Sequence, residues 1–276
     1  MIRHCVAFVF AASLALYLGA ARPAAAAASE QQDAWPGLAD DIFKGRPLAD
    51  GSGIVGIEMP VRAEDAAIVP VTMRVTLPPG DTRSLKTLTL VIDDNPAPVA
   101  ATFKIGANSG ISAISTRVRV NSYTNVHAVA ELSDDKLYAV AIYVKASGGC
   151  SAPAAKNADE AAASVGQMKF REFAKPTDGP ASAPREAQIM IRHPNNSGLQ
   201  RDQVTLLYIP PRFVDELSVW QGDALLFSMV GGISISEDPN FRFTFVPNGA
   251  ATFRVEAKDT DGKMYRHEWP AGATEM

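Results

Sequence analysis

The chain has 276 residues, a formal net charge of −4 and 47% hydrophobic residues. This length predicts one or two domains, and the hydrophobic content is sufficient for a buried core. The slight negative charge argues against nucleic acid as a partner, because phosphate binding requires a basic face.

Residues 1–28 are typical of a secretory signal peptide. Arg3 and His4 precede an apolar run over 5–20, and an Ala-rich stretch with several A-x-A cleavage sites follows. The run is short for a membrane span, which needs about 20 residues. We therefore predict cleavage near Ala26 or Ala28, export to the periplasm and no membrane attachment afterwards; an uncleaved anchor is the alternative.

Residues 29–53 are predicted to form a partly helical N-terminal segment. Trp35, Leu38, Ile42 and Phe43 recur at helical spacing, and several glycines and prolines follow them.

Two stretches, 54–146 and 187–270, are rich in Val, Ile, Thr and aromatic residues, with turn residues between short runs. The predicted strands of the first stretch are 54–59, 68–76, 87–92, 99–105, 112–120, 124–132 and 137–145. Those of the second are 189–192, 204–208, 214–220, 224–230, 241–247, 251–258 and 263–269. About seven short strands per stretch are typical of an Ig-like sandwich. The predicted fold class is all-β, with two Ig-like sandwiches in tandem.

Residues 147–186 separate the two predicted sandwiches and consist mainly of Ala, Ser, Gly, Pro and Lys. This composition favours a flexible, mostly disordered linker. A short helix within 157–173 is the alternative.

Cys150 is the residue most able to carry chemistry, because signal cleavage would leave it as the only cysteine of an exported chain. It follows Gly148 and Gly149 just after the last strand of the first sandwich. An extended arm of five residues would carry its thiol roughly 15 Å from the domain. This arrangement predicts a thiol presented to another protein. An incidental linker cysteine and a dimer-forming disulfide are the alternatives.

No catalytic, cofactor or metal motif accompanies Cys150. His127, His193 and His267 lack metal-ligand spacing, and each is interpreted as an ordinary surface or turn histidine. The pair Asp93 and Asp94 is interpreted as part of a turn. We therefore predict that the chain is not an enzyme and binds no cofactor or metal.

Two series of short motifs resemble a known pair of proteins. The first series comprises Ile57-Glu58-Met59-Pro60, Asp94-Asn95-Pro96-Ala97-Pro98, Ser115-Thr116-Arg117-Val118, Asn125-Val126-His127-Ala128-Val129 and Gly148-Gly149-Cys150. It resembles SoxY, the sulfur-substrate carrier subunit of the periplasmic thiosulfate-oxidising system. The second comprises Ile191-Arg192-His193-Pro194, Ile209-Pro210-Pro211-Arg212-Phe213-Val214 and Asp238-Pro239-Asn240-Phe241-Arg242-Phe243, and resembles its partner SoxZ.

The resemblance implies two Ig-like sandwiches that pair within one chain, and a sulfur intermediate held covalently on Cys150 while periplasmic oxidoreductases act on it. The chain also looks like fused SoxYZ-like proteins associated with PQQ quinoprotein dehydrogenases, so its partners would be Sox-type enzymes or such a dehydrogenase or its cytochrome c. A non-catalytic binding or scaffold module for the dehydrogenase is the alternative. In SoxY a Gly-Gly-Cys-Gly-Gly arm ends the chain, whereas here the chain continues through Ser151. Partner sites must then be open clefts, or the linker is cleaved, or the task has changed.

Overall fold

The computed structural model describes residues 33–153, 163–173 and 183–272. The predicted signal peptide and residues 157–162 of the alternative linker helix lie outside these ranges. From Ala34 onward the chain forms one compact unit. Within the described ranges, no helix is long and apolar enough to cross a membrane.

The N-terminal segment contains the predicted helix, α1 (Trp35–Phe43). Pro36 lies in its first turn, where the missing N–H costs nothing, and Lys44 ends it in the left-handed conformation with φ of 58°. Ala39 and Phe43 pack against Val129 and Leu137. The helix thus covers part of the first sandwich.

Fifteen strands are assigned among the described residues. Those of the first half are β1 (Leu48–Asp50), β2 (Val55–Glu58), β3 (Val69–Val75), β4 (Leu85–Ile92), β5 (Val99–Ile105), β6 (Ala113–Val118), β7 (Thr124–Leu132) and β8 (Leu137–Val144). Those of the second half are β9 (Met168–Glu172), β10 (Arg185–Ile191), β11 (Val214–Gln221), β12 (Ala224–Gly231), β13 (Asn240–Phe245), β14 (Thr252–Asp259) and β15 (Met264–Pro270). The prediction of a mostly β chain with two β domains is confirmed.

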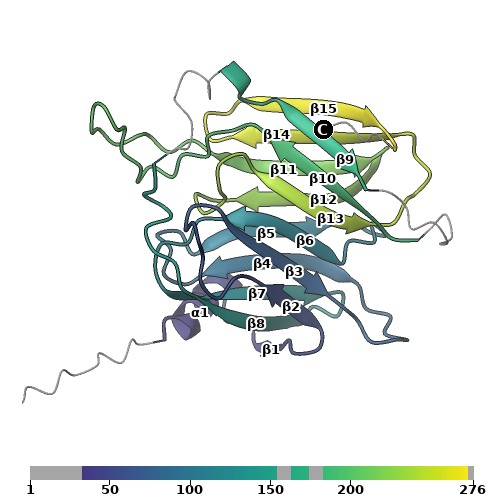
Figure 1. The fold of residues 1–276 in the computed structure, drawn as a ribbon. Coiled ribbons are helices and arrows are strands. Elements are labelled where there is room, and N and C mark those ends of the chain that lie inside the picture. Colours follow the sequence, from purple (N-terminus) through teal and green to yellow (C-terminus); the bar gives the residue numbers. More distant parts are fainter. Residues whose placement is uncertain (1–32, 154–162, 174–182, 273–276) are drawn as a thin grey trace, which may run out of the picture. The chain divides into compact units, whose positions relative to one another are not determined.

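The strands form two sheets, and each sheet contains strands of both halves (Figure 1). The larger has the order β1-β8-β7-β4-β5-β12-β11-β14-β15, and the smaller has the order β2-β3-β6-β13-β10-β9. The halves join where β5 pairs antiparallel with β12 over five residue pairs and where β6 pairs with β13 over two. The two sandwiches are therefore continuous through hydrogen-bonded strands.

A single hydrophobic core runs through both sandwiches. At the junction, the ring of Phe103 on β5 lies 6.0 Å from that of Phe227 on β12 and 6.1 Å from that of Phe241 on β13. All three side chains are fully buried. Packing of aromatic rings therefore reinforces the strand pairing between the halves.

Two strands and one loop differ from the sequence prediction. The short edge strand β1 was not predicted, and β9 lies in the segment predicted as linker, where it pairs with β10 and buries Phe170. The predicted strand over 204–208 is wrong, because these residues form an exposed loop between β10 and β11. Its apolar residues have no sheet face to cover.

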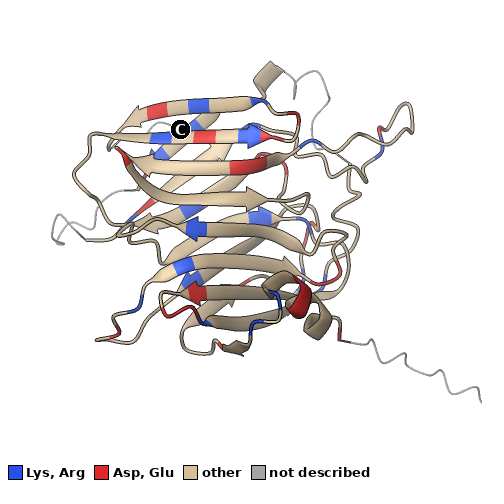
Figure 2. Ribbon diagram, turned by 180° about the vertical axis from the view of Figure 1, so that it is seen from behind, with Lys and Arg blue, Asp and Glu red and all other residues tan. Residues whose placement is uncertain are grey.

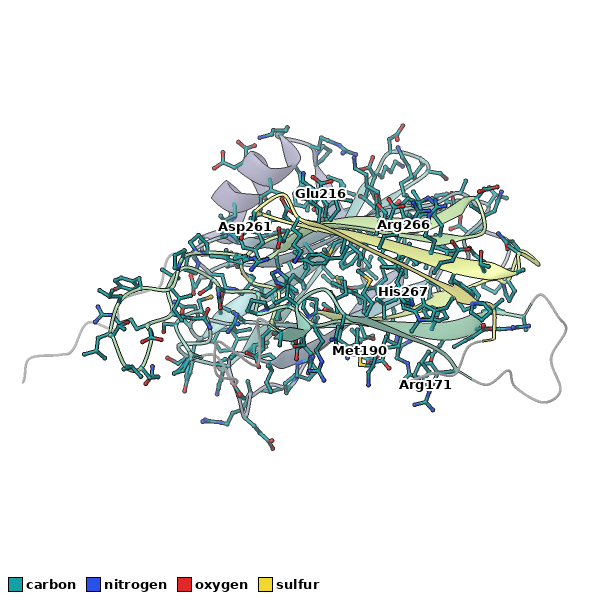
Figure 3. All side chains as sticks on the ribbon, turned by 90° about the horizontal axis from the view of Figure 1, so that it is seen from above. Arg171, Met190, Glu216, Asp261, Arg266 and His267 are labelled. Carbon is teal, nitrogen blue, oxygen red and sulfur yellow. The ribbon has the colours of Figure 1, made fainter. Side chains whose placement is uncertain are left out.

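Charged residues of both signs are interspersed along the strands of the larger sheet (Figure 2). Lys258 pairs with Glu216 at 2.9 Å across neighbouring strands, and Glu256 lies within 3.5 Å of Arg254. Figure 3 labels Arg266 and His267 on β15 and Arg171 and Met190 on β9 and β10, so both layers of the second half can be followed. His267 is exposed, as predicted.

Candidate functional site at Cys150

The Gly-Gly-Cys segment is folded back onto the first sandwich. Gly148 N–H donates a hydrogen bond to the Asn121 carbonyl at 2.8 Å, and Gly149 N–H donates to the Val120 carbonyl at 3.1 Å. Cys150 has 0% of its surface exposed. The prediction of an extended, solvent-presented thiol is therefore wrong for this conformation, because the backbone donors of the segment find acceptors in the residues that follow β6.

Gly149 is required here by close packing. A Cβ at this position would lie 2.0 Å from the Ala66 carbonyl oxygen and 2.7 Å from that of Val120. Gly148 has φ of +77°, a conformation that L side chains rarely adopt. The two glycines thus allow the segment to pack closely against the backbone of the first domain. The sequence pattern alone is equally consistent with a mobile, extended arm.

The second half of the chain covers the segment from the other side. Ser197 Oγ donates a hydrogen bond to the Cys150 carbonyl, and Gln200 Nε2 donates to the Ala152 carbonyl at 2.9 Å. Both residues belong to the loop between β10 and β11 and are buried. Cys150 therefore lies at the junction of the two halves.

A buried arginine lies beside the cysteine. Arg119 is 1% exposed, and its two terminal nitrogens donate to the carbonyls of Gly149 at 3.2 Å and Asn195 at 3.3 Å. Its Nε has no hydrogen-bond partner among the described residues. Burial lowers the pKa of Arg119, while the nearby charges of Glu237, Cys150 and Asp65 oppose that shift. The Nε–H of Arg119 can therefore donate a hydrogen bond to a further acceptor.

Burial raises the pKa of the Cys150 thiol to about 11, and the positive charge of Arg119 offsets only part of this effect. At neutral pH the group is a protonated thiol. Because the thiolate is the nucleophile, the raised pKa lowers the reactivity of the docked cysteine. Chemistry at Cys150 requires the segment to leave this position.

A network of buried polar side chains lies behind Arg119 in the second half. His193 Nδ1 lies 2.7 Å from Asn195 Oδ1, and His193 Nε2 lies 3.4 Å from Asp259 Oδ2. Arg212 and Tyr265 also donate to Asp259 Oδ2, at 3.0 and 2.9 Å. Burial alone would raise the pKa of Asp259, but these hydrogen bonds and one from the Lys263 N–H hold it at about 2.

The interpretation of His193 and His127 as ordinary surface or turn residues is wrong. His193 is buried in the network above, and burial lowers its pKa. His127 is buried between the Trp35 ring, stacked at 3.6 Å, and the turn residue Asp93 at 3.1 Å. No sequence signal could identify their contacts with Asp259, Trp35 and Asp93, because these partners lie 34 to 92 residues away in the chain.

The described residues contain no cluster of three His, Cys, Asp or Glu side chains suited to a metal ion. Two surface cavities, of about 330 and 270 Å³, are lined by neither Cys150 nor Arg119. The chemistry-bearing feature of the junction is therefore the thiol with its neighbouring guanidinium.

Comparisons with known proteins agree with the two-part organisation. The family model described as sulfur oxidation protein SoxY matches residues 39–150, and that described as sulphur oxidation protein SoxZ matches residues 175–270. The first match ends at Cys150. No curated protein sequence matches the chain.

Solved structures resemble parts of the chain. The sulfur carrier protein SoxY from Chlorobium limicola f thiosulfatophilum is 23% identical with a TM-score of 0.33, covering 41% of this chain and 91% of its own. A superoxide reductase (neelaredoxin) from Ignicoccus hospitalis is 12% identical with a TM-score of 0.30, covering 33% of this chain and 79% of its own.

SoxY and SoxZ are non-catalytic carrier proteins of sulfur oxidation that pair with each other in SoxYZ complexes and work with Sox enzymes. This agrees with the prediction that the chain is not an enzyme. The two halves of this chain pair through shared sheets. The chain consists of a SoxY domain, residues 39–150, followed by a SoxZ domain, residues 175–270.

Proposed function

We propose that the chain is a periplasmic carrier that holds a sulfur intermediate covalently on Cys150 and presents it to partner oxidoreductases. The observation that carries the proposal is the position of Cys150. It is the last residue of the SoxY match, and it lies between the two domains beside the buried Arg119. A carrier thiol must alternate between protection and presentation, and this junction provides the protected position.

The chemistry that suits the site is formation of a bond between Cys150 Sγ and a sulfur anion such as thiosulfate. Joining the thiol to this dianion releases one proton and two electrons, which the partner oxidoreductase would accept. The product on Cys150 carries one negative charge. Its bulk and its charge do not fit a position where the cysteine is fully buried, so the loaded segment would lie outside the junction.

Arg119 supports an anionic cargo. A buried guanidinium is costly unless its charge is balanced. The hydrogen bonds of its terminal nitrogens go to carbonyl oxygens, and its Nε is unsatisfied among the described residues. When the loaded segment leaves the junction, Arg119 would lose its Gly149 acceptor and would attract the negative charge of the adduct.

The test is the intact mass of the mature protein isolated from its native host under sulfur-oxidising conditions. We expect an added mass that a reductant removes, assigned by peptide mapping to Cys150 and absent from Cys150→Ser. An unmodified thiol under all growth conditions, together with a Cys150→Ser strain that oxidises sulfur normally, would exclude the carrier role.

A second candidate is a non-catalytic scaffold for a PQQ quinoprotein dehydrogenase or its cytochrome c. The full burial and raised pKa of Cys150 favour it, since buried structural cysteines are inert. It predicts that the purified dehydrogenase binds wild type and Cys150→Ser with equal affinity. Binding that requires Cys150, or no binding, would argue against it.

A further inference from the structure

The loop between β10 and β11 exposes a group of apolar side chains at its end. Val204, Leu206, Leu207 and Tyr208, here called the apolar tip, are 90%, 66%, 69% and 60% exposed. Single exposed apolar residues are common, but four within five residues form a patch that indicates an interaction site. In Figure 1 the green loop that contains the tip extends beyond the ends of the strands.

The apolar tip is held outward by a defined local structure. The Asp202 carboxylate accepts hydrogen bonds from the N–H groups of Val204 and Thr205, at 3.1 and 2.7 Å. Leu206 adopts a left-handed φ of 59°, a conformation that is unfavourable for a residue other than glycine. Such strain in a hydrogen-bonded turn is typical of a functional loop.

The charge at the tip indicates the chemistry of a partner. Arg201 lies over the Tyr208 ring at 4.6 Å and donates to its hydroxyl at 3.1 Å. Among the described residues, no carboxylate forms an ion pair with Arg201. Tyrosine and arginine are among the side chains that contribute most to the binding energy of protein interfaces. A matching surface would be an apolar recess edged by a carboxylate.

The base of the same loop holds the cysteine segment. Ile209 N–H donates to the Gln200 carbonyl at 2.9 Å and closes the hairpin that carries the tip. The Gln200 side chain in turn binds the Ala152 carbonyl, and Ser197 binds that of Cys150. The tip is thus continuous with the junction that covers Cys150.

We infer that the apolar tip is the docking element for the oxidoreductase that loads Cys150, and that docking displaces the loop from the cysteine segment. This inference rests on the carrier function proposed above. A folded protein fits the tip better than a membrane, because membrane-binding surfaces combine an apolar face with clustered Lys and Arg, and the tip has the single Arg201. Docking would withdraw Ser197 and Gln200 together and free Cys150 at the moment a partner is present.

The test compares three proteins in the native host: wild type, a tip variant with Leu206→Asn and Leu207→Ser, and a control with Val61→Ser and Met264→Ser. Asn tolerates the left-handed conformation at 206, and the control residues are exposed apolar side chains outside the loop, so little change in stability is expected. The measurement is the fraction of Cys150 that carries an adduct, by intact mass. We expect at least a tenfold decrease for the tip variant and no change for the control.

The outcomes separate the two proposals. An adduct in wild type and an equal adduct in the tip variant would overturn the docking role alone. No adduct in wild type would overturn the carrier function and the inference with it. Two further results would also overturn the docking role. If wild type bound vesicles of phosphatidylethanolamine and phosphatidylglycerol and the tip variant did not, the tip would be assigned to a membrane. If wild type dimerised in sedimentation velocity and the tip variant did not, the tip would be assigned to a second copy of the chain.

Discussion

At the scale of single residues, burial controls the reactivity of Cys150. Its pKa is raised from 9.0 to about 11, so its thiolate fraction at pH 8 is roughly a hundredfold lower than that of an unperturbed thiol. We expect iodoacetamide to alkylate the native protein about a hundredfold more slowly than the urea-unfolded protein at this pH. Equal rates would show that the docked segment does not protect the thiol in solution.

The same shift gives the docked segment a pH dependence. A folded pKa raised above the unfolded value contributes stability that is fully present below about pH 9 and is lost as the pH rises through about 11. The stability of wild type should therefore fall relative to that of Cys150→Ser over this range, as followed by urea unfolding.

Gly149→Ala should release the cysteine segment. Its added Cβ would meet the Ala66 carbonyl oxygen at 2.0 Å, an overlap that costs about 2 kcal/mol or more. This corresponds to a roughly 30-fold larger undocked population and an equal increase in the alkylation rate of Cys150. Gly56→Ala is the matched control, since the nearest atom to its Cβ is 3.9 Å away. An unchanged rate in Gly149→Ala would contradict the packing described for this glycine.

Asp259→Asn should destabilise the SoxZ domain. The carboxylate balances the charge of Arg212 and accepts from His193 and Tyr265, and removing one partner of a buried ionic network costs about 3–5 kcal/mol. The lowered pKa of Asp259 contributes stability that is present above about pH 4 and is lost as the pH falls through about 2. In urea unfolding, the difference between wild type and variant should therefore be large at pH 7 and smaller near pH 2. A difference in unfolding free energy between wild type and Asp259→Asn that does not change with pH would contradict an ionised Asp259 in the folded protein.

At the scale of the elements, the junction depends on β5, β12 and β13. Phe103 on β5 is fully buried and contacts the rings of Phe227 and Phe241, which belong to the other domain. Phe103→Ala should lower the free energy of unfolding by about 3–5 kcal/mol. Phe103→Ala should also split the urea transition into two, because it weakens the contact between the domains. Leu132→Ala is the control, since Leu132 is buried within the SoxY domain and its loss should leave one transition. A single transition in both variants would contradict this role of the ring.

At the scale of the whole molecule, the shared sheets should hold the domains together without a covalent connection. A protease site placed within residues 154–162 would allow the chain to be cut between the SoxY and SoxZ domains. Because β5 pairs with β12 and β6 with β13, we expect the two fragments to co-elute in size-exclusion chromatography after cleavage. Separation of the fragments in native buffer would show that the linker, and not the junction, maintains the pairing.

Much of this architecture was readable from local patterns. Trp35, Leu38, Ile42 and Phe43 recur at helical spacing and form α1, and the predicted strand over 112–120 contains β6. The motifs that resemble SoxY end at Gly148-Gly149-Cys150, and the SoxY family match ends at the same residue. Local patterns misjudged residues 204–208, because an apolar run predicts burial only where a neighbouring element can cover it, and no element among the described residues covers this run.

The sequence by itself determined that the chain is mostly β with two β domains and that Cys150 follows two glycines at the end of the first domain. Only the tertiary structure decided that the thiol is buried, that Arg119 lies beside it and that Ser197 and Gln200 cover it. The physical reason is sequence distance. These contacts join residues 30 to 48 positions apart in the chain, and their geometry follows from the pairing of whole sheets.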